Sequence, residues 1–188
     1  MWYVIQVLKG REDAMAALIG RVVPAEALDE CFSPKYVTEA KVRGDWVPVQ
    51  KDLFPGYLIA VTNDPLTLEQ HLLRMDEFAR VLMQGDTFVP LAKDEVELIA
   101  AFTQPGQRVV PMSRGFKEGD QVTVTSGPLV GRDYLIKSIN RRKSLAFLEV
   151  NLCGRALTTR VGLAVLSKSE SPEAKLAALY PREALPSA

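Results

Sequence analysis

The sequence predicts an α+β protein in which an α/β sandwich with a mostly antiparallel sheet precedes a small β-barrel. Helical and strand-like hydrophobic patterns alternate through residues 1–103, as in helices packed on a sheet. Glycine- and proline-containing segments of little periodicity occupy residues 104–115. Short strand patterns separated by tight turns fill residues 116–168. We therefore expect two domains, a linker crossed by few contacts, and a tail at 169–188 that is disordered or carries one short helix.

The first domain is expected to open with a strand, a helix and a hairpin. Residues 2–8 are rich in aromatic and β-branched side chains, which fit a half-buried strand. Apolar residues recur every three or four positions over residues 11–22, which predicts an amphipathic helix. Residues 31–49 form a hairpin around Arg43-Gly44-Asp45, and Pro48 places the returning strand at a sheet edge.

The central stretch of this domain is residues 53–61. Pro55 keeps the preceding residues extended, Gly56 permits a bend, and residues 58–61 form an apolar run that fits a buried strand. Taken alone, the stretch is most simply an ordinary core strand after a turn, because aromatic side chains beside a turn are usually packed.

Two further helices should follow this strand. The first begins either at Asp64-Pro65, which suits a first helical turn, or at Thr67, whose spacing to Gln70 suits a capping box; the sequence does not decide between them. A short strand at residues 81–83 and a helix at 94–102 complete the domain.

The second domain is expected to hold short strands only. They are predicted at residues 121–125, 134–139, 146–152, 157–159 and 163–166. Five such strands with tight turns in about 50 residues are typical of a small barrel.

Composition limits the possible classes of protein. The 188 residues are 47% hydrophobic and 24% charged, which indicates a globular chain. The sequence carries neither an export signal nor an apolar run long enough to span a membrane, so we expect a cytoplasmic protein. Cys31 and Cys153 lack the spacing of a zinc site or a disulfide framework and are expected to be buried.

The residues indicate a binding protein and not an enzyme. The single histidine, His71, lies in a predicted helix without a partner at metal spacing. The sequence has no glycine-rich phosphate loop, nucleophile elbow or acidic cluster, so we assign no catalytic residue, metal or cofactor.

Charge is divided unevenly although the net charge is zero. Residues 1–115 hold 12 Lys and Arg against 16 Asp and Glu, whereas residues 116–168 hold 9 against 4. A compact basic segment in a neutral protein is either a nucleic-acid surface or an ordinary solvated face, and charge alone leaves both open.

Three motifs in order resemble the bacterial NusG family of transcription elongation factors over residues 1–168. The motifs are Trp2-Tyr3-Val4, Phe54-Pro55-Gly56-Tyr57, and Gly119-Asp120-Gln121-Val122 with Gly127-Pro128-Leu129-Val130-Gly131. The resemblance implies an NGN domain at 1–103 and an SH3-like KOW barrel at 116–168. It further implies that Tyr3, Phe54, Pro55 and Tyr57 form the apolar pocket for the clamp helices of RNA polymerase. Non-template DNA is a further expected contact, and the protein is expected to be a monomer without a membrane partner.

The barrel is similar to that of the LoaP group of NusG paralogues, operon-specific antiterminators whose KOW domain binds a nascent RNA hairpin. Arg141, Arg142 and Lys143 lie between two predicted strands, where cations can contact RNA phosphates. Three further cations are expected nearby: Lys137, Arg155 and Arg160. A charged hairpin that serves only solubility is the simpler alternative.

Other functions stay open at this point. A general NusG-type factor would use its barrel to bind a ribosomal protein or the termination factor Rho, and a KOW-type ribosome- or RNA-binding protein would have no polymerase role. Tyr134, which replaces a glycine common in this family, is expected to be packed, with stacking on an RNA base as the alternative. The alternating β-branched strands argue against a helical form of the barrel.

Overall fold

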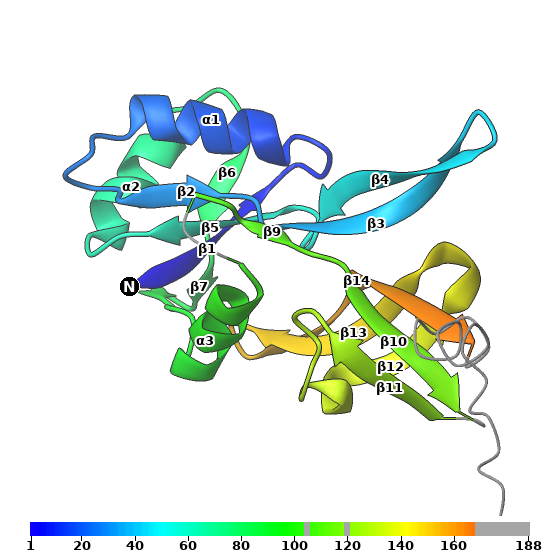
Figure 1. Cartoon of the computed structure of the whole chain (residues 1–188). Helices are drawn as coiled ribbons and strands as arrows, with labels where there is room; N and C mark the ends of the chain where they lie inside the picture. Colours follow the sequence, from blue (N-terminus) through cyan, green and yellow to red (C-terminus); the bar gives the residue numbers. More distant parts are fainter. Residues whose placement is uncertain (104–105, 119–120, 168–188) are drawn as a thin grey trace, which may run out of the picture.

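The computed structural model describes residues 1–103, 106–118 and 121–167. Its strands and helices alternate and then give way to strands, which confirms the predicted α+β class (Figure 1). The elements are, in chain order, β1 (Trp2–Val7), α1 (Glu12–Val22), β2 (Glu30–Phe32), β3 (Lys35–Val42), β4 (Asp45–Asp52), β5 (Tyr57–Val61), α2 (Pro65–Leu73), β6 (Ala79–Val81), β7 (Met83–Gln84), β8 (Thr87–Phe88), α3 (Lys93–Phe102), β9 (Val109–Val110), β10 (Ser113–Glu118), β11 (Gln121–Ser126), η1 (Asp133–Leu135), β12 (Ile136–Asn140), η2 (Arg141–Lys143), β13 (Leu145–Leu152) and β14 (Arg155–Ser167).

The first domain is built on an antiparallel sheet with the strand order β2-β5-β1-β6. Side chains of β1 alternate between its two faces, so Tyr3, Ile5 and Val7 pack in one apolar cluster while Val4 packs in another. The first cluster lies under α1 and α2, which contribute Met15, Ile19, Leu68 and Leu72. The second faces the barrel (Figure 1).

The start of α2 follows the Asp-Pro alternative. Asp64 Oδ1 accepts a hydrogen bond from the Thr67 N–H at 3.0 Å, and Pro65 occupies the first helical turn. This bond satisfies an N–H that would otherwise lack a partner at the helix start. Hydrogen bonding by Thr67, first by its side chain and then by its backbone N–H, lowers the pKa of Asp64. Thr67 is therefore inside the helix and is not its cap.

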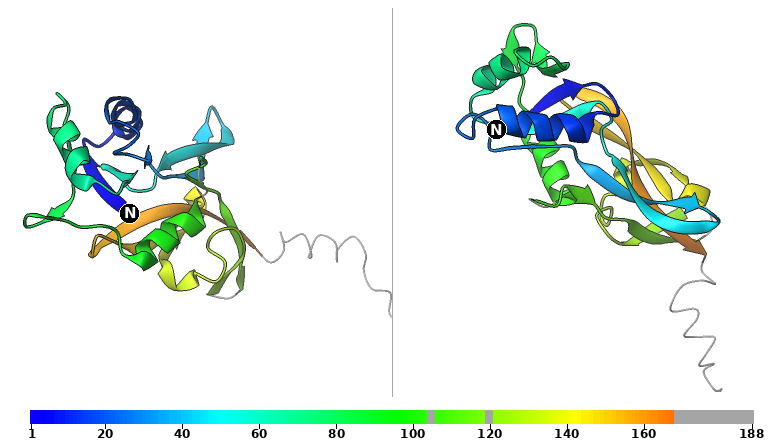
Figure 2. Two further views of the ribbon diagram at one scale, coloured as in Figure 1. Left: turned by 90° about the vertical axis from the view of Figure 1, so that its left-hand side faces the viewer. Right: turned by 90° about the horizontal axis from the view of Figure 1, so that it is seen from above.

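The β3–β4 hairpin extends away from the first domain (Figures 1 and 2). β4 is an edge strand, as Pro48 predicts, in a sheet with the order β4-β3-β9. β9 belongs to the predicted linker, yet it pairs in parallel with the start of β3 through Lys35 and Tyr36. Only Pro111 and Met112 separate β9 from the first barrel strand.

The second domain is a five-stranded sheet with the order β11-β10-β14-β13-β12. β14 joins two predicted short strands: its first part pairs with β13, and from Leu163 onward it runs parallel to β10. The described residues of the barrel form strands with two short 3-10 helices, so this structure contains the β form. The tail at 169–188 lies outside the described residues.

The barrel packs directly on the first domain, whereas the sequence predicted few contacts across the linker. The Thr159 hydroxyl donates to the Leu53 carbonyl oxygen, and the Gly154 N–H donates to Glu95 Oε1 at 3.3 Å. A Cβ built on Gly162 would lie 2.1 Å from the Val37 carbonyl oxygen, so only glycine permits this approach of β14 to β3. Apolar side chains of both domains share one cluster, and burying that surface is the physical reason for the contact.

Among the described residues, no helix has both the length and the apolar character needed to cross a bilayer.

Candidate functional site

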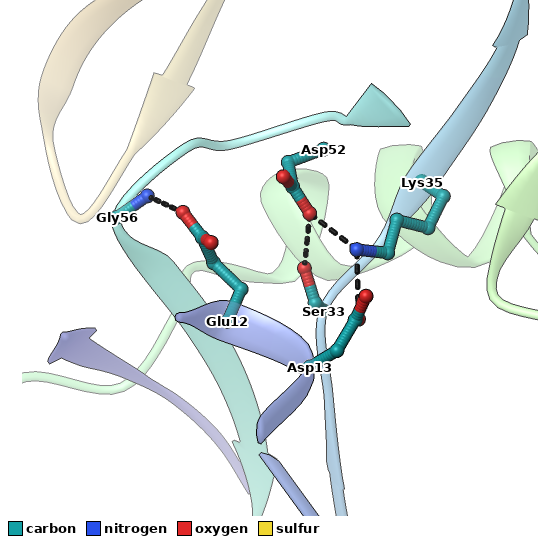
Figure 3. Close-up of polar contacts among 6 residues, drawn as sticks. All are labelled: Glu12, Asp13, Ser33, Lys35, Asp52 and Gly56. Atoms are coloured by element: carbon teal, nitrogen blue, oxygen red, sulfur yellow. Dashed lines mark hydrogen bonds and ion pairs between the residues drawn. The ribbon is translucent and has the colours of Figure 1, made fainter. Parts of the chain in front are cut away.

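The turn at residues 53–57, here called the anchor turn, is held rigidly from inside the first domain. Gly56 has φ +89°, a conformation that favours glycine, and its N–H donates to Oε1 of Glu12 at 2.7 Å (Figure 3). The Glu12 side chain comes from the start of α1 and is buried. The Val7 N–H donates to the Gly56 carbonyl at 2.9 Å, so strand and helix both hold the turn.

The structure brings three of the four predicted pocket residues together. Phe54 is 5% exposed and belongs to the apolar cluster shared with the barrel, Tyr57 packs partly buried against that cluster, and Pro55 is exposed. Tyr3 is 3% exposed and lies on the opposite face of the sheet, under the helices. Tyr3 is separated from the other three because side chains alternate along a strand. Trp2, the residue before it, lies on the face of the sheet on which Tyr57 packs.

An ionic network lies beside the anchor turn (Figure 3). The Lys35 ammonium contacts Oδ1 of Asp13 at 2.7 Å and also contacts Asp52, whose Oδ1 accepts from the Ser33 hydroxyl at 3.1 Å. Burial lowers the pKa of Lys35, but its hydrogen bonds to the two carboxylates outweigh that effect and raise it. The network joins α1 to both strands of the hairpin and so positions the residues that precede the anchor turn.

A second turn, Arg141–Lys143, here called the basic turn, joins β12 to β13 as the helix η2. Asn140 Oδ1 accepts from the Lys143 N–H at 3.2 Å, and Ser144 ends the turn with φ 48°. All three cationic residues are exposed, and none forms an ion pair with any residue that the structure describes.

The other cations predicted to bind RNA do not all join the basic turn. The Arg160 guanidinium lies over the Phe147 ring at 5.5 Å. Arg160 is two residues before Gly162, and Gly162 pairs with Leu145, which follows the basic turn. Lys137 pairs with Glu149 at 3.4 Å. Arg155 lies at the other end of the β13–β14 hairpin, seven residues and about 23 Å along the strand from Gly162. The six residues therefore do not form one patch.

Sequence reasoning missed the tip of the β3–β4 hairpin, residues 41–46. Lys41, Arg43 and Trp46 are exposed there, and Trp46 is 55% exposed although it is large and apolar. The available signal was a tryptophan that closely follows two cations across a glycine-containing turn, where no core is expected.

Cys31, Cys153 and Tyr134 are more exposed than the sequence predicted. Cys31 and Cys153 are free and half-buried, and burial raises the pKa of the Cys31 thiol to about 12 and that of Cys153 to about 11. Tyr134 is 76% exposed, so the prediction that it is packed is wrong; it lies in η1, on a connection between strands and not within the barrel.

The structure combines an α/β sheet domain with a small barrel and carries one turn with aromatic side chains and one turn with three adjacent cations. The family model described as "Transcription termination factor nusG" matches residues 1–100. The transcription termination/antitermination protein NusG of Thermus thermophilus is 29% identical over 166 residues, which cover 82% of this chain and 90% of that protein. Its namesake in Escherichia coli strain K12 is 25% identical over 177 residues, which cover 89% and 96%.

A solved structure described as "Domain interaction in Thermotoga maritima NusG" covers 87% of this chain and 92% of its own, with 20% sequence identity and a TM-score of 0.48. Since the family model matches more than half of the chain, the chain belongs to the NusG family. It is a homologue of transcription termination and antitermination proteins.

Proposed function

We propose that this chain is a specialised transcription elongation factor that promotes processive antitermination. Its first domain binds the clamp helices of RNA polymerase, and its barrel binds a hairpin in the nascent RNA. The observation that carries the RNA assignment is the basic turn: three adjacent exposed cations without an ion-pair partner in the described chain. Cations without a carboxylate partner can neutralise phosphates, and the release of counterions favours binding.

Phe54, Pro55 and Tyr57 supply the polymerase contact in this proposal. A stiff aromatic anchor contributes large contact area at small entropic cost. Phe54 is buried in the cluster that the barrel shares, so the barrel must move before the polymerase can reach it. Tyr3 supports the sheet from its helical side instead of lining this contact.

The basic turn and its neighbour Arg160 form the RNA contact of the barrel. Lys137 is paired with Glu149 and Arg155 lies at the far end, so neither is needed for this contact. We further propose that the protein acts as a cytoplasmic monomer, and that non-template DNA is an additional contact.

The decisive experiment is transcription by purified bacterial RNA polymerase through a terminator placed downstream of the leader of the gene's own operon. Wild-type protein should increase readthrough only when the leader is present. The variant Arg141→Ala/Arg142→Ala/Lys143→Ala should lose this effect. The control Arg21→Ala/Arg74→Ala/Lys93→Ala removes the same charge from exposed positions in α1, directly after α2 and at the start of α3, and should retain it. Readthrough that ignores both leader and basic turn would contradict the RNA part of the proposal.

The polymerase contact needs a separate measurement. Phe54→Ala and Tyr57→Ala should each weaken binding to the polymerase by about 30-fold, which corresponds to about 2 kcal/mol. Circular dichroism must first establish that Phe54→Ala folds, because Phe54 is buried. Tyr57→Ala removes a partly exposed side chain and serves as the second variant. Unchanged affinity in both folded variants would remove the anchor turn from the interface.

A second function has one observation in its favour. Val130 and Tyr134 are 47% and 76% exposed on the connection between β11 and β12, and exposed apolar groups suit a protein partner. In this alternative the barrel binds a ribosomal protein or Rho. Capture of either protein by the wild-type barrel, lost in Val130→Ser/Tyr134→Ser, would favour a general NusG-type factor.

A further inference from the structure

The hairpin tip, residues 41–46, carries an aromatic side chain and a lysine on one face. Lys41 pairs with Trp46, and Val42 pairs with Asp45, across the antiparallel strands. Paired residues share a face and neighbouring pairs alternate, so Lys41 and Trp46 lie on one face and Asp45 on the other. Glu39, two residues before Lys41, shares the face of Lys41 and Trp46 by the same alternation.

The basic turn of the barrel lies beside this hairpin. The Ser144 hydroxyl donates to Oε2 of Glu39 at 3.0 Å, and the Thr38 hydroxyl donates to the Lys143 carbonyl oxygen at 3.4 Å. Lys41 lies about 7 Å further along β3 than Glu39. Glu39 shares the face of Lys41 and Trp46, whereas Thr38 lies on the opposite face, so the two bonds place the basic turn against the edge of β3. Figure 1 shows β3 running above this part of the barrel.

The junction contains two acidic residues: Glu39, which accepts a hydrogen bond from Ser144, and Asp45, which lies on the face opposite to Lys41 and Trp46. Its five cations are Lys41, Arg43, Arg141, Arg142 and Lys143, all exposed. Across the described ranges none of them has a carboxylate within ion-pair distance. The two domains thus bring five exposed cations and an exposed indole to segments that meet at one junction.

We propose that the hairpin tip and the basic turn form one RNA-binding surface shared by the two domains. The cations contact phosphates of a paired stem, and Trp46 stacks on an unpaired base of the same RNA. Stems recognised by shape and phosphates, with unpaired bases recognised by stacking, are the usual features of RNA hairpins. The inference rests on the proposed function for the barrel half and adds the first-domain half.

The shared surface exists only while the barrel is docked on β3. Gly162 permits this docking because any side chain there would meet the Val37 backbone. The hairpin tip should therefore strengthen RNA binding by the wild-type chain and should contribute nothing once the docking is broken.

Fluorescence anisotropy with labelled leader RNA of the gene's own operon tests the surface in the full chain. Trp46→Ala should weaken binding about tenfold, since base stacking on an aromatic ring is worth that much. Lys41→Gln/Arg43→Asn should reduce the slope of log K against log salt by about 1.5, because two phosphate contacts are lost. Asparagine is used at position 43 because Arg43 has φ 52°, which asparagine tolerates. The control Arg21→Ala/Arg74→Ala should change neither value.

Tryptophan fluorescence gives a readout that a merely structural role would not change. The chain has two tryptophans, and Trp2 is partly buried and packs edge-on against Phe32 in the first domain. Leader RNA should therefore quench the emission of wild-type protein, and Trp46→Phe should abolish that quenching.

The outcomes separate this inference from the function on which it rests. Affinity within twofold of wild type in Trp46→Ala and in Lys41→Gln/Arg43→Asn, together with a large loss in Arg141→Ala/Arg142→Ala/Lys143→Ala, would overturn the shared surface and leave the barrel contact intact. Wild-type protein that does not bind the leader RNA would overturn both. Loss in the tip variants and in the basic-turn variant, each with a wild-type unfolding transition, supports the shared surface.

Discussion

The anchor turn and the basic turn are both short connections beside β-strands, but they differ in how far their side chains are buried. The anchor turn is held by Glu12 and by β1, and its Phe54 is buried in a cluster to which the barrel contributes. The basic turn is held by a local cap from Asn140 and by two hydrogen bonds to β3, and its three cations are exposed. Under the proposed function, an RNA can reach the basic turn without any movement of the protein, whereas a polymerase must first displace the barrel.

The largest effect should come from breaking the buried attachment of the linker. Arg108 forms two hydrogen bonds to the Glu30 carboxylate and lies over the rings of Trp2 and Phe32 at 5.3 and 4.3 Å. Arg108→Ala would leave Glu30 partly buried without its partner, so the free energy of unfolding should fall by about 3 kcal/mol. Urea denaturation measures this. Arg108→Lys retains charge without the planar fork and should lose less, and equal losses in both would argue against the bidentate contact.

The next effect concerns the anchor turn itself. Glu12→Ala leaves the buried N–H of Gly56 without an acceptor, which should cost about 2 kcal/mol of stability. The loosened turn should also bind RNA polymerase less tightly at a temperature where the variant is folded. Glu12→Gln keeps an acceptor oxygen and should behave closer to wild type. A Glu12→Ala protein as stable as wild type would mean that this bond does not hold the turn.

A smaller effect is expected from a substitution that undocks the barrel and so makes the anchor turn as accessible as the basic turn. Gly162→Ala places a methyl group against the Val37 backbone, so the barrel should leave the first domain and expose Phe54. Polymerase affinity should then rise at least tenfold, about 1.4 kcal/mol, if docking limits it. Gly20→Ala is the matched control, because apart from its chain neighbours and the backbone of its own helix no atom lies within 4 Å of the new methyl group.

Cys153 provides a direct measure of that docking. Its sulfur lies 3.9 Å from the Val89 carbonyl oxygen of the first domain, and burial raises its pKa to about 11. A raised pKa leaves little thiolate at pH 8, so alkylation should be slow in wild type and faster in Gly162→Ala. Cys31, with its pKa near 12, should stay slow in both proteins. Equal rates for Cys153 would show that the alanine is accommodated without undocking.

The smallest effect on stability should come from the basic turn. Arg141→Ala/Arg142→Ala/Lys143→Ala removes exposed side chains without ion pairs, so the free energy of unfolding should change by less than about 0.5 kcal/mol. A larger loss would mean that the turn has a structural role and would weaken its assignment to RNA.

The sequence predicted the elements better than their assembly. Hydrophobic period and turn residues were sufficient for α1, for the edge position of Pro48, and for the strand that follows Gly56. Alternation along β1 was also readable, and it would have separated Tyr3 from Phe54 had the pairing of β1 with β5 been known.

The relation of the two domains could not be predicted in this way. From the sequence, Gly162 is simply a glycine within a predicted strand region. No neighbouring residue indicates that the absence of a side chain there lets the backbone of Val37 approach. The same holds for Glu39 and Ser144, which are distant in sequence and meet only when the barrel docks. Local periodicity carries no information on such contacts because they depend on the orientation of two folded units.

The short connection of Pro111 and Met112 sets how far the barrel can travel. Three Cα–Cα steps separate Val110 in β9 from Ser113 in β10, so an extended connection spans about 11 Å at most. While β9 stays paired with β3, an undocked barrel remains at an effective concentration in the millimolar range around the face that it left. Under the proposed function, a polymerase competes with a tethered barrel at that concentration. An RNA held by the barrel is then presented at the same concentration to whatever binds the anchor turn.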